Sequence, residues 1–337
     1  MNLPRTILWI LLTFCLMAHF NPQAEAQPVV LKLATLAPDG SAWMKTFHRI
    51  NQELTSNTDG AVTMRAYPGG VMGDDQAVLR KMRIGQIHIA GLTGLGLGFI
   101  LPDTQVLGTP FLFRNYREVD HVVTGVTETM EQGFLKQGFV LIGWSEIGFI
   151  YMMSNKAVGR LEDFQKAKVW VPEGDRMSQA VFAKAGVSPV PLTVPDILLA
   201  LQTGLVDVVY NSPTAAIALQ WFTKVKYITR VPLGYALGGV VITQKAYQKI
   251  PQEHRKTVGE IFLRNLVTLN AQTRKNNDEA LRIMTQEGIQ SVDLPSEELA
   301  RFQEIAWDAR EEMAGRVFSA DIVREITTHL NEVRGGE

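Results

Sequence analysis

Residues 168–172 read Lys-Val-Trp-Val-Pro, residues 200–207 read Ala-Leu-Gln-Thr-Gly-Leu-Val-Asp, and residues 211–213 read Asn-Ser-Pro. The first stretch predicts a short β-strand, followed by a helix from about residue 175 to residue 185. The second stretch contains the end of another helix, which its glycine terminates. A buried strand over 206–210 then brings the asparagine to a turn before proline. Ligand contacts in open α/β sheets lie at the ends of apolar strands, so this region predicts an α/β protein with a binding site there.

The region before it predicts alternating strands and helices. Strands are expected over 29–36, 62–67 and 87–90, where apolar and β-branched residues gather. One helix is expected after the turn at 39–41, and a second over 74–84, because each begins near Asp or Ser. The short connections in this β-α-β-α-β order favour a mostly parallel sheet covered by helices.

One helix–glycine–strand spacing occurs twice in the chain. The first copy is Leu79, Met82, Gly85, Ile87 and Ile89, and the second is Leu198, Leu201, Gly204, Val206 and Val208. Two interpretations remain open. Any α/β protein can repeat this unit, or the chain has two lobes of similar build that offer their strand ends to a shared cleft.

Two places suit a chain that crosses between lobes, since a crossing needs extended backbone with glycine or proline. One is Gly148, between expected strands over 139–144 and 149–154. The other is Pro232 with Gly234.

The N-terminus predicts an export signal. Arg5 precedes an apolar segment over 7–20, and Ala24-Glu25-Ala26 offers small residues for cleavage. The apolar segment is shorter than the roughly 20 residues that a membrane span requires. Removal of residues 1–26 takes away one cation, one anion and the only cysteine, so the formal net charge stays at −1. Without a basic excess we expect no nucleic-acid partner, and without cysteine the exported chain must rely on its core.

Five short motifs follow one another along the chain. They are Tyr67–Gly73 (Tyr-Pro-Gly-Gly-Val-Met-Gly), Leu107–Phe113 (Leu-Gly-Thr-Pro-Phe-Leu-Phe), Lys168–Pro172, Val190–Leu192 with Asp196, and Asp207 with Asn211. Each motif is weak alone, but five in this order are specific. Together they resemble the solute-binding proteins of TRAP (tripartite ATP-independent periplasmic) transporters, of the DctP type, over nearly the whole exported chain.

The resemblance implies an α/β, two-lobed periplasmic binding protein of the type II-like, Venus-flytrap kind, with mixed sheets, hinge strands and a long lobe-spanning helix. We expect a signal peptide over 1–26, lobe 1 over 27–147 plus about 236–265, and lobe 2 over 148–235. Residues 266–337 are expected to form the long helix and C-terminal helices that pack across the lobes. The implied function is capture of a small organic solute by lobe closure and its delivery to TRAP membrane permease subunits driven by an ion gradient.

The chain departs from the family at two positions. The arginine of the family's Lys-Ile-Arg-Val-Pro pattern, which clamps a substrate carboxylate, is Trp170 here, and a second basic position is Ile150. A buried carboxylate without a cation costs several kcal/mol or takes up a proton. Trp170 offers a large apolar face and one N–H donor instead. We therefore expect a ligand with a substantial apolar or aromatic part, although Arg176 or Arg65 could serve a carboxylate from another direction.

The candidate ligand-binding residues lie near predicted strand ends, in turns or in the first loop: Trp170, Asn211, Phe149, Ile150, Tyr151, Trp43, Trp144, Glu173 and Tyr210. Each has an alternative interpretation. Asn211 could cap a turn, any single aromatic residue could belong to the core, and Glu173 could be a solvated acid unless the solute carries an amine.

The sequence offers no catalytic motif. The glycines at 94, 96 and 98 do not have dinucleotide-loop spacing. The histidines after residue 26 do not sit at metal-ligand spacing, and no thiol accompanies them. We expect no enzyme activity, no cofactor and no metal. Two further functions remain as alternatives: a periplasmic hydrophobic-ligand carrier or sensor that feeds a partner protein, and an exported enzyme, which requires a group with a shifted pKa deep in the cleft.

Overall fold

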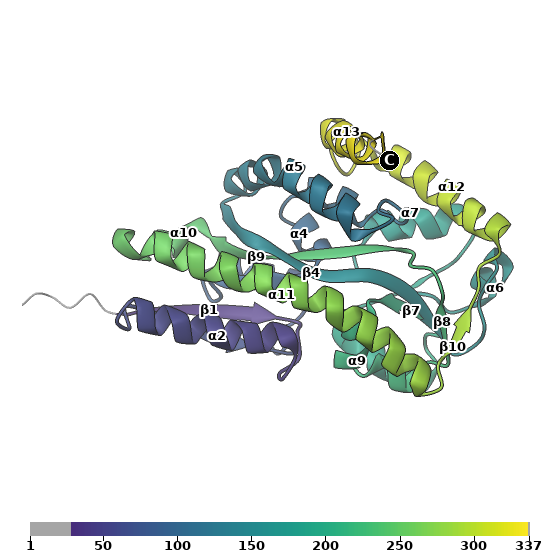
Figure 1. The fold of residues 1–337 in the computed structure, drawn as a ribbon, viewed down its shortest axis with the longest axis horizontal. Helices are drawn as coiled ribbons and strands as arrows, with labels where there is room; N and C mark the ends of the chain where they lie inside the picture. Colours follow the sequence, from purple (N-terminus) through teal and green to yellow (C-terminus); the bar gives the residue numbers. More distant parts are fainter. Residues whose placement is uncertain (1–27, 336–337) are drawn as a thin grey trace, which may run out of the picture.

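The computed structural model describes residues 28–335, so the predicted signal peptide lies outside the described residues. Two lobes share one mixed β-sheet, and a long helix runs along both (Figure 1). Within the described residues, no helix is both long and apolar enough to cross a bilayer.

The main sheet has the strand order β10-β8-β4-β9-β3-β1-β2, and β7 also pairs with β4. Its strands are β1 (Val29–Thr35), β2 (Val62–Tyr67), β3 (Ile89–Leu92), β4 (Phe139–Ser154), β7 (Val208–Asn211), β8 (Tyr227–Thr229), β9 (Gly234–Thr243) and β10 (Gln290–Val292). The expected parallel pairing holds where β1 lies between β2 and β3. The sheet is nevertheless mixed, because β9 runs antiparallel to both β3 and β4.

A second, two-stranded parallel sheet belongs to the other lobe. It consists of β5 (Trp170–Pro172) and β6 (Val190–Leu192). The residue before β5, Val169, forms a parallel bridge to Val208 of β7. Residues 168–172, which predicted a short strand, therefore lie beside β7.

The two shared strands are β4 and β9. They pair from Phe139 opposite Thr243 to Ile150 opposite Gly234, and β4 continues into the second lobe, where it pairs with β7 and β8. The two strands expected on either side of Gly148 are thus one strand. Register shifts interrupt its pairing between Leu141 and Gly143 and between Glu146 and Gly148.

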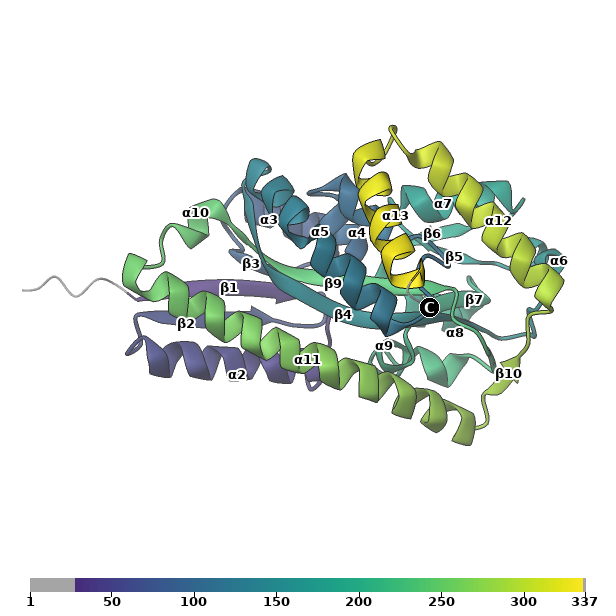
Figure 2. The same cartoon turned by 45° about the horizontal axis from the view of Figure 1, so that its top comes forward.

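The helices cover both faces of the sheet (Figures 1 and 2). They are α2 (Ala42–Asn57), α3 (Asp75–Arg83), α4 (Gly94–Gly98), α5 (Tyr116–Lys136), α6 (Leu161–Lys166), α7 (Arg176–Lys184), α8 (Ile197–Thr203), α9 (Pro213–Ala218), α10 (Gln244–Tyr247), α11 (Gln252–Gln286), α12 (Ser296–Met313) and α13 (Ala320–Gly335). Short 3₁₀ helices occupy Pro102–Gly108, Val194–Asp196 and Trp221–Lys224.

Helix α11 packs against α2 of the first lobe, against the shared strand β4, and against α9 of the second lobe. Its N-terminal half buries Ile261 and Leu266 in the core under β1. Its C-terminal half buries Met284 in the core that surrounds Trp170. One helix therefore contributes apolar side chains to the cores of both lobes. The last two helices cover the opposite side, where α12 packs on α7 and α13 on α5 (Figure 2).

Gly148 lies where β4 passes between the lobes, and its backbone requires glycine. Its φ is +104°, and a Cβ there would lie 2.2 Å from the Asn277 Nδ2 atom. The Asn277 amide donates to the Ile147 carbonyl oxygen at 3.0 Å and accepts from the Thr214 N–H at 3.1 Å. This side chain of α11 therefore joins β4 to α9 of the second lobe.

We expect Gly148→Ala to lower the free energy of unfolding by about 2 kcal/mol, because it adds backbone strain and displaces the Asn277 amide. Urea denaturation followed by circular dichroism measures the loss. Gly138→Ala is the matched control, since φ there is +82° but nothing lies within 4 Å of an added Cβ. Equal losses in the two variants would show that only backbone strain matters at Gly148.

Candidate solute-binding cleft

Strand ends from both lobes meet at one cleft, which has two neighbouring cavities. Both cavities are lined by five residues in common: Leu36, Thr93, Ile147, Val194 and Asn211. Leu36 follows β1, Thr93 follows β3, and Asn211 ends β7. The bulge between Glu146 and Gly148 of β4 leaves Ile147 unpaired, and this residue lies at the wall shared by both cavities.

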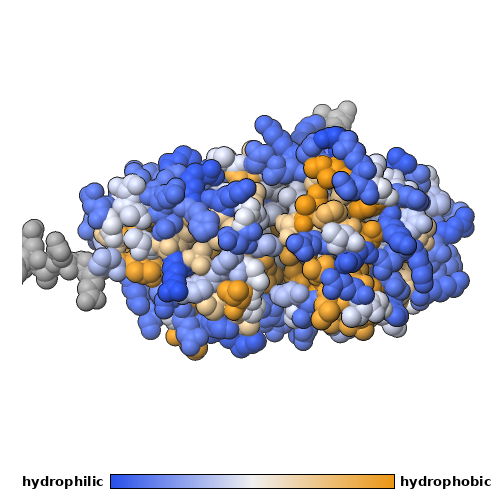
Figure 3. All heavy atoms as spheres, turned by 90° about the horizontal axis from the view of Figure 1, so that it is seen from below, coloured by the Kyte–Doolittle hydropathy of each residue, from blue (hydrophilic) through white to orange (hydrophobic). Residues whose placement is uncertain are grey.

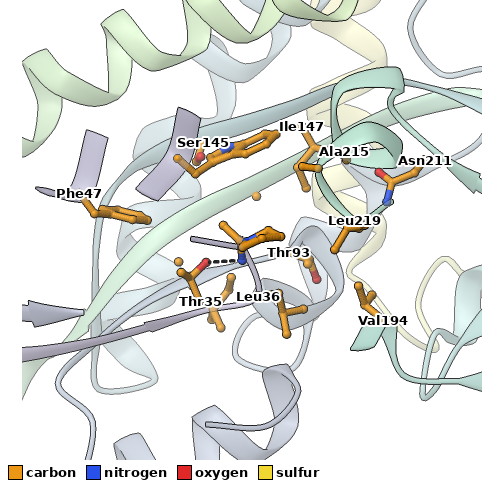
Figure 4. Close-up of a pocket in the computed structure, with 17 residues that line it drawn as sticks. Thr35, Leu36, Phe47, Thr93, Ser145, Ile147, Val194, Asn211, Ala215 and Leu219 are labelled. Carbon is orange, nitrogen blue, oxygen red and sulfur yellow. Dashed lines mark hydrogen bonds between the residues drawn. The ribbon is translucent and has the colours of Figure 1, made fainter. Parts of the chain in front are cut away.

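We call the smaller cavity the apolar compartment. It measures about 120 Å³. Figure 4 shows Phe47 of α2 toward one end and Asn211 toward the other, with Ile147, Leu219 and Val194 around the space between them. Its few polar side chains are Thr35, Thr93, Ser145 and Asn211. The Thr35 hydroxyl already accepts the Ala37 N–H at 3.2 Å. This compartment suits a hydrocarbon or aromatic group.

We call the larger cavity the acidic compartment. It measures about 210 Å³ and is lined by Asp74, Asp75, Glu173 and Asp175. Among the residues that line either compartment there is no lysine, arginine or histidine. An anionic ligand would meet carboxylates here and no counter-ion.

Asp75 is the most buried of these acids, with 7 % of its surface exposed. Its Oδ2 atom accepts the Thr93 hydroxyl and, at 3.3 Å, the Thr93 N–H. Burial raises the pKa of Asp75 to about 6, and the hydrogen bonds from Thr93 only partly oppose this shift. The carboxyl is therefore poised to change its charge with pH or with a nearby cation.

Asp175 holds the start of α7. Its two oxygens accept the Ser178 N–H at 3.0 Å and the Ser178 hydroxyl at 2.6 Å, and burial raises the pKa of Asp175. Among the described residues that line it, three have buried polar atoms that meet no hydrogen-bond partner, namely the Tyr210 hydroxyl, the Tyr235 hydroxyl and Gln105 Oε1. The acidic compartment thus has unused hydrogen-bonding capacity.

Trp170 lies in the wall of the acidic compartment, but only 3 % of its surface is exposed. Its ring packs against Tyr210 at 5.1 Å between centroids and against Trp221 at 5.3 Å. The sequence suggested that its N–H is available to a ligand. In the structure this N–H donates to the Leu192 carbonyl oxygen at 2.9 Å, so only the ring remains for contact.

The structure brings six of the nine candidate residues to the cleft. Trp43 lines the apolar compartment, Asn211 lines both compartments, and the acidic compartment takes Trp170, Ile150, Glu173 and Tyr210. The Oδ1 atom of Asn211 also accepts the Ser212 N–H at 2.9 Å. This atom therefore caps the turn, as the alternative interpretation of Asn211 suggested.

The other three candidates lie in packing positions rather than among the cleft-lining residues. Phe149 packs edge-on against Tyr116 and Tyr235. Trp144 donates its N–H to the Thr127 hydroxyl of α5 at 2.9 Å, and Tyr151 packs against core residues. Strand-end position alone does not decide which face of β4 a side chain occupies, because the bulge changes the alternation.

The alternative cations do not reach the cleft. Arg65 and Arg176 are both exposed, and neither lines a compartment. The Arg65 guanidinium instead lies 5.3 Å from the centroid of the Tyr67 ring. The structure therefore supplies no replacement for the clamp arginine among the described lining residues.

Sequence reasoning missed Asp75 and Thr93, although the repeated spacing pointed toward the end of β3, which Thr93 follows. Gly85 and Gly204 both have positive φ after a helix, and each is followed by a strand that ends at the cleft. Thr93 and Ser212 occupy equivalent places and each caps a short helix, α4 and α9. The second copy indicated Asn211, and the same argument applied to the first copy indicates the end of β3.

Two lobes, shared crossing strands, a helix along both lobes and a cleft of strand ends define a two-lobed solute-binding protein. The chain belongs to the DctP family, described as bacterial extracellular solute-binding protein, family 7, whose model matches residues 33–315. It is therefore a TRAP-type solute-binding protein rather than an enzyme, as the motifs predicted.

The similar proteins include curated relatives and solved structures. The C4-dicarboxylate-binding periplasmic protein DctP of Rhodobacter capsulatus is 23% identical over 87% of this chain and 89% of its own length. The sialic acid-binding periplasmic protein SiaP of Vibrio cholerae is 23% identical over 77% of this chain and 81% of its own length. A TRAP periplasmic solute-binding protein of Desulfovibrio salexigens with bound orotic acid has a TM-score of 0.84 at 17% identity, covering 90% of this chain and 99% of that one.

Proposed function

We propose that this protein captures a small organic solute with an apolar or aromatic body and a neutral or cationic head. Lobe closure would hold the body in the apolar compartment and the head in the acidic one. The observation that carries the proposal is the composition of the cleft wall, to which the described residues contribute four acids and no basic side chain.

The energetics support a ligand without a free carboxylate. Several kcal/mol would be lost on burying an unpaired carboxylate, and more where other carboxylates face it. An ammonium or amide head instead meets Asp75, Asp175 and the free oxygen of Gln105. The solved relatives with orotic acid, galactonate or succinate bind acids. We infer that this chain differs from them because Trp170 occupies the position of the clamp arginine.

Three compounds with one apolar body separate the possible heads: 3-phenylpropylamine, 3-phenylpropionamide and 3-phenylpropionate. We expect the amine or the amide to raise the melting temperature and to give a measurable heat in calorimetry, and the carboxylate to give neither at equal concentration. Tightest binding of the carboxylate would contradict the proposed ligand class and leave the family membership untouched.

Asp75→Asn should remove a pH-dependent penalty. The pKa of this carboxyl is about 6 in the folded chain, whereas the ordinary value for an aspartate is 3.8. Ionisation of Asp75 therefore does not affect the stability of the folded chain below pH 4, but it lowers the free energy of unfolding by up to about 3 kcal/mol above pH 6. We expect the variant to gain stability relative to the natural chain as pH rises from 4 to 7, measured by urea denaturation. The exposed Asp39→Asn is the control and should show no such gain.

The same variant tests the cationic head. A cation beside Asp75 favours its ionised form, so binding of the amine should tighten between pH 5 and pH 7 in the natural chain. Asp75→Asn should abolish this pH dependence. An unchanged pH dependence would place the ligand head elsewhere.

We further propose that the chain is exported through its N-terminal signal and delivers the solute to TRAP membrane permease subunits. The family supports a role outside the cytoplasm, and the export signal fits it. Adjacent genes for a small and a large membrane subunit would support delivery to a permease. Their absence would favour the carrier or sensor that feeds another protein.

A further inference from the structure

Two histidines and a glutamate that are distant in sequence meet on the outer surface, away from the cleft. His121 lies on α5, and His329 and Glu332 lie one turn apart on α13. The prediction of no metal ligands rested on spacing along the chain, where 208 positions separate the two histidines. Packing of α13 on α5 overcomes this separation.

The ligand atoms of the three residues converge. His121 Nε2 and His329 Nδ1 each lie 3.0 Å from Glu332 Oε2. The two rings stand nearly perpendicular, with centroids 5.6 Å apart. All three ligand atoms lie within 4.8 Å of one another. One carboxylate oxygen thus faces two imidazole nitrogens at a distance that a single small ion could bridge.

The surface of α5 leaves room for the side chain of His329. Gly125 lies one turn after His121, and a Cβ there would be 2.5 Å from His329 Nε2. The absence of a side chain at Gly125 therefore lets the His329 ring approach α5 closely. Arg117 and Asp120 border the same hollow. Asp120 is occupied by an ion pair with Arg274, so it does not compete as a ligand.

We propose that His121, His329 and Glu332 bind one divalent transition-metal ion of the Zn²⁺ class. Two neutral imidazole nitrogens and one carboxylate oxygen suit this class better than Mg²⁺ or Ca²⁺, which prefer oxygen ligands. The ion would take the place of the protons that now lie between the nitrogens and Glu332. It would tie the C-terminal helix to α5, because its ligands come from both helices.

Zn²⁺ titration of the untagged exported chain tests the proposal, after treatment with a chelator and dialysis. We expect one ion per chain by calorimetry and a rise of a few degrees in melting temperature. His121→Gln, His329→Gln and Glu332→Gln should each weaken Zn²⁺ binding at least tenfold. Glu332→Gln is the most conservative, because it retains hydrogen bonding while it removes the charge.

A second histidine–acid pair provides the matched control. His48 Nε2 lies 3.6 Å from Asp39 Oδ1 on the exposed surface, and residues 28–335 supply no third ligand there, so His48→Gln should leave Zn²⁺ affinity unchanged. Mg²⁺ at the same concentration should neither bind measurably nor raise the melting temperature. Absence of Zn²⁺ binding, or binding that all three ligand variants retain, would overturn the site. Neither result would bear on the cleft.

Discussion

Trp170→Ala should destabilise the second lobe and should also remove a large part of the wall of the acidic compartment. The ring is almost fully buried against Tyr210 and Trp221, and its N–H satisfies the Leu192 carbonyl oxygen. Removal of a buried tryptophan leaves a cavity, so we expect the free energy of unfolding to fall by about 4 kcal/mol. Ligand affinity should fall by about 2–4 kcal/mol if the ring edge is a central contact.

Calorimetry under conditions where the variant remains folded separates these two effects. Trp144→Ala is the matched control, because this half-buried tryptophan also donates one N–H but does not line the cleft. It should lose stability and retain ligand affinity. A Trp170→Ala protein that binds with unchanged affinity would assign Trp170 to the core alone.

Arg274→Ala should cost about 3 kcal/mol, since it leaves a buried acid without its counter-ion. Arg274 of α11 donates to Glu146 Oε2 at 2.8 Å and to Asp120 Oδ2 at 3.0 Å, and its guanidinium lies 4.5 Å from the Tyr116 ring centroid. The Glu146 side chain is only 7% exposed. This cluster joins the long helix to β4 and α5 beside the crossing at Gly148.

Urea denaturation measures this effect, and two further variants interpret it. Arg282→Ala removes an exposed arginine from the same helix and should change stability by less than about 0.5 kcal/mol. Glu146→Gln combined with Arg274→Ala should recover part of the loss, because no buried charge remains unpaired. Full additivity of the two substitutions would show that the pair is not energetically coupled.

Much of the fold follows from local sequence. Glycines after apolar helices and the apolar strands behind them indicated the strand ends near Thr93 and Asn211, and the family resemblance implied a long lobe-spanning helix. The sequence did not predict that β4 and β9 pair antiparallel within the sheet, because pairing partners more than 80 residues apart leave no local pattern. The same reason explains why the bulge that places Ile147 in the cleft was not predicted.

The candidate site was predicted in part. Trp170, Asn211 and Glu173 lie at the cleft because motif residues mark strand ends, whereas Phe149 and Trp144 contact residues of helix α5. Asp75 resembled an ordinary first-turn acid of α3. Only the fold shows that it is buried beside Thr93. The His121–Glu332–His329 group likewise depends on tertiary packing alone.

On the face shown in Figure 3, apolar atoms gather mainly on one half, while the remainder is largely hydrophilic. The proposed solute specificity depends on the interior of the cleft rather than on this surface. Among the described residues, four carboxylates line the acidic compartment, mainly apolar side chains line the apolar compartment, and no basic group lines either.

Mass spectrometry of the protein purified from its native host, with identification of the small molecule released on denaturation, tests this account most directly. We predict a compound with an apolar or aromatic body and a neutral or cationic head. A hydrophilic dicarboxylate or sugar acid bound at one molecule per chain would contradict it.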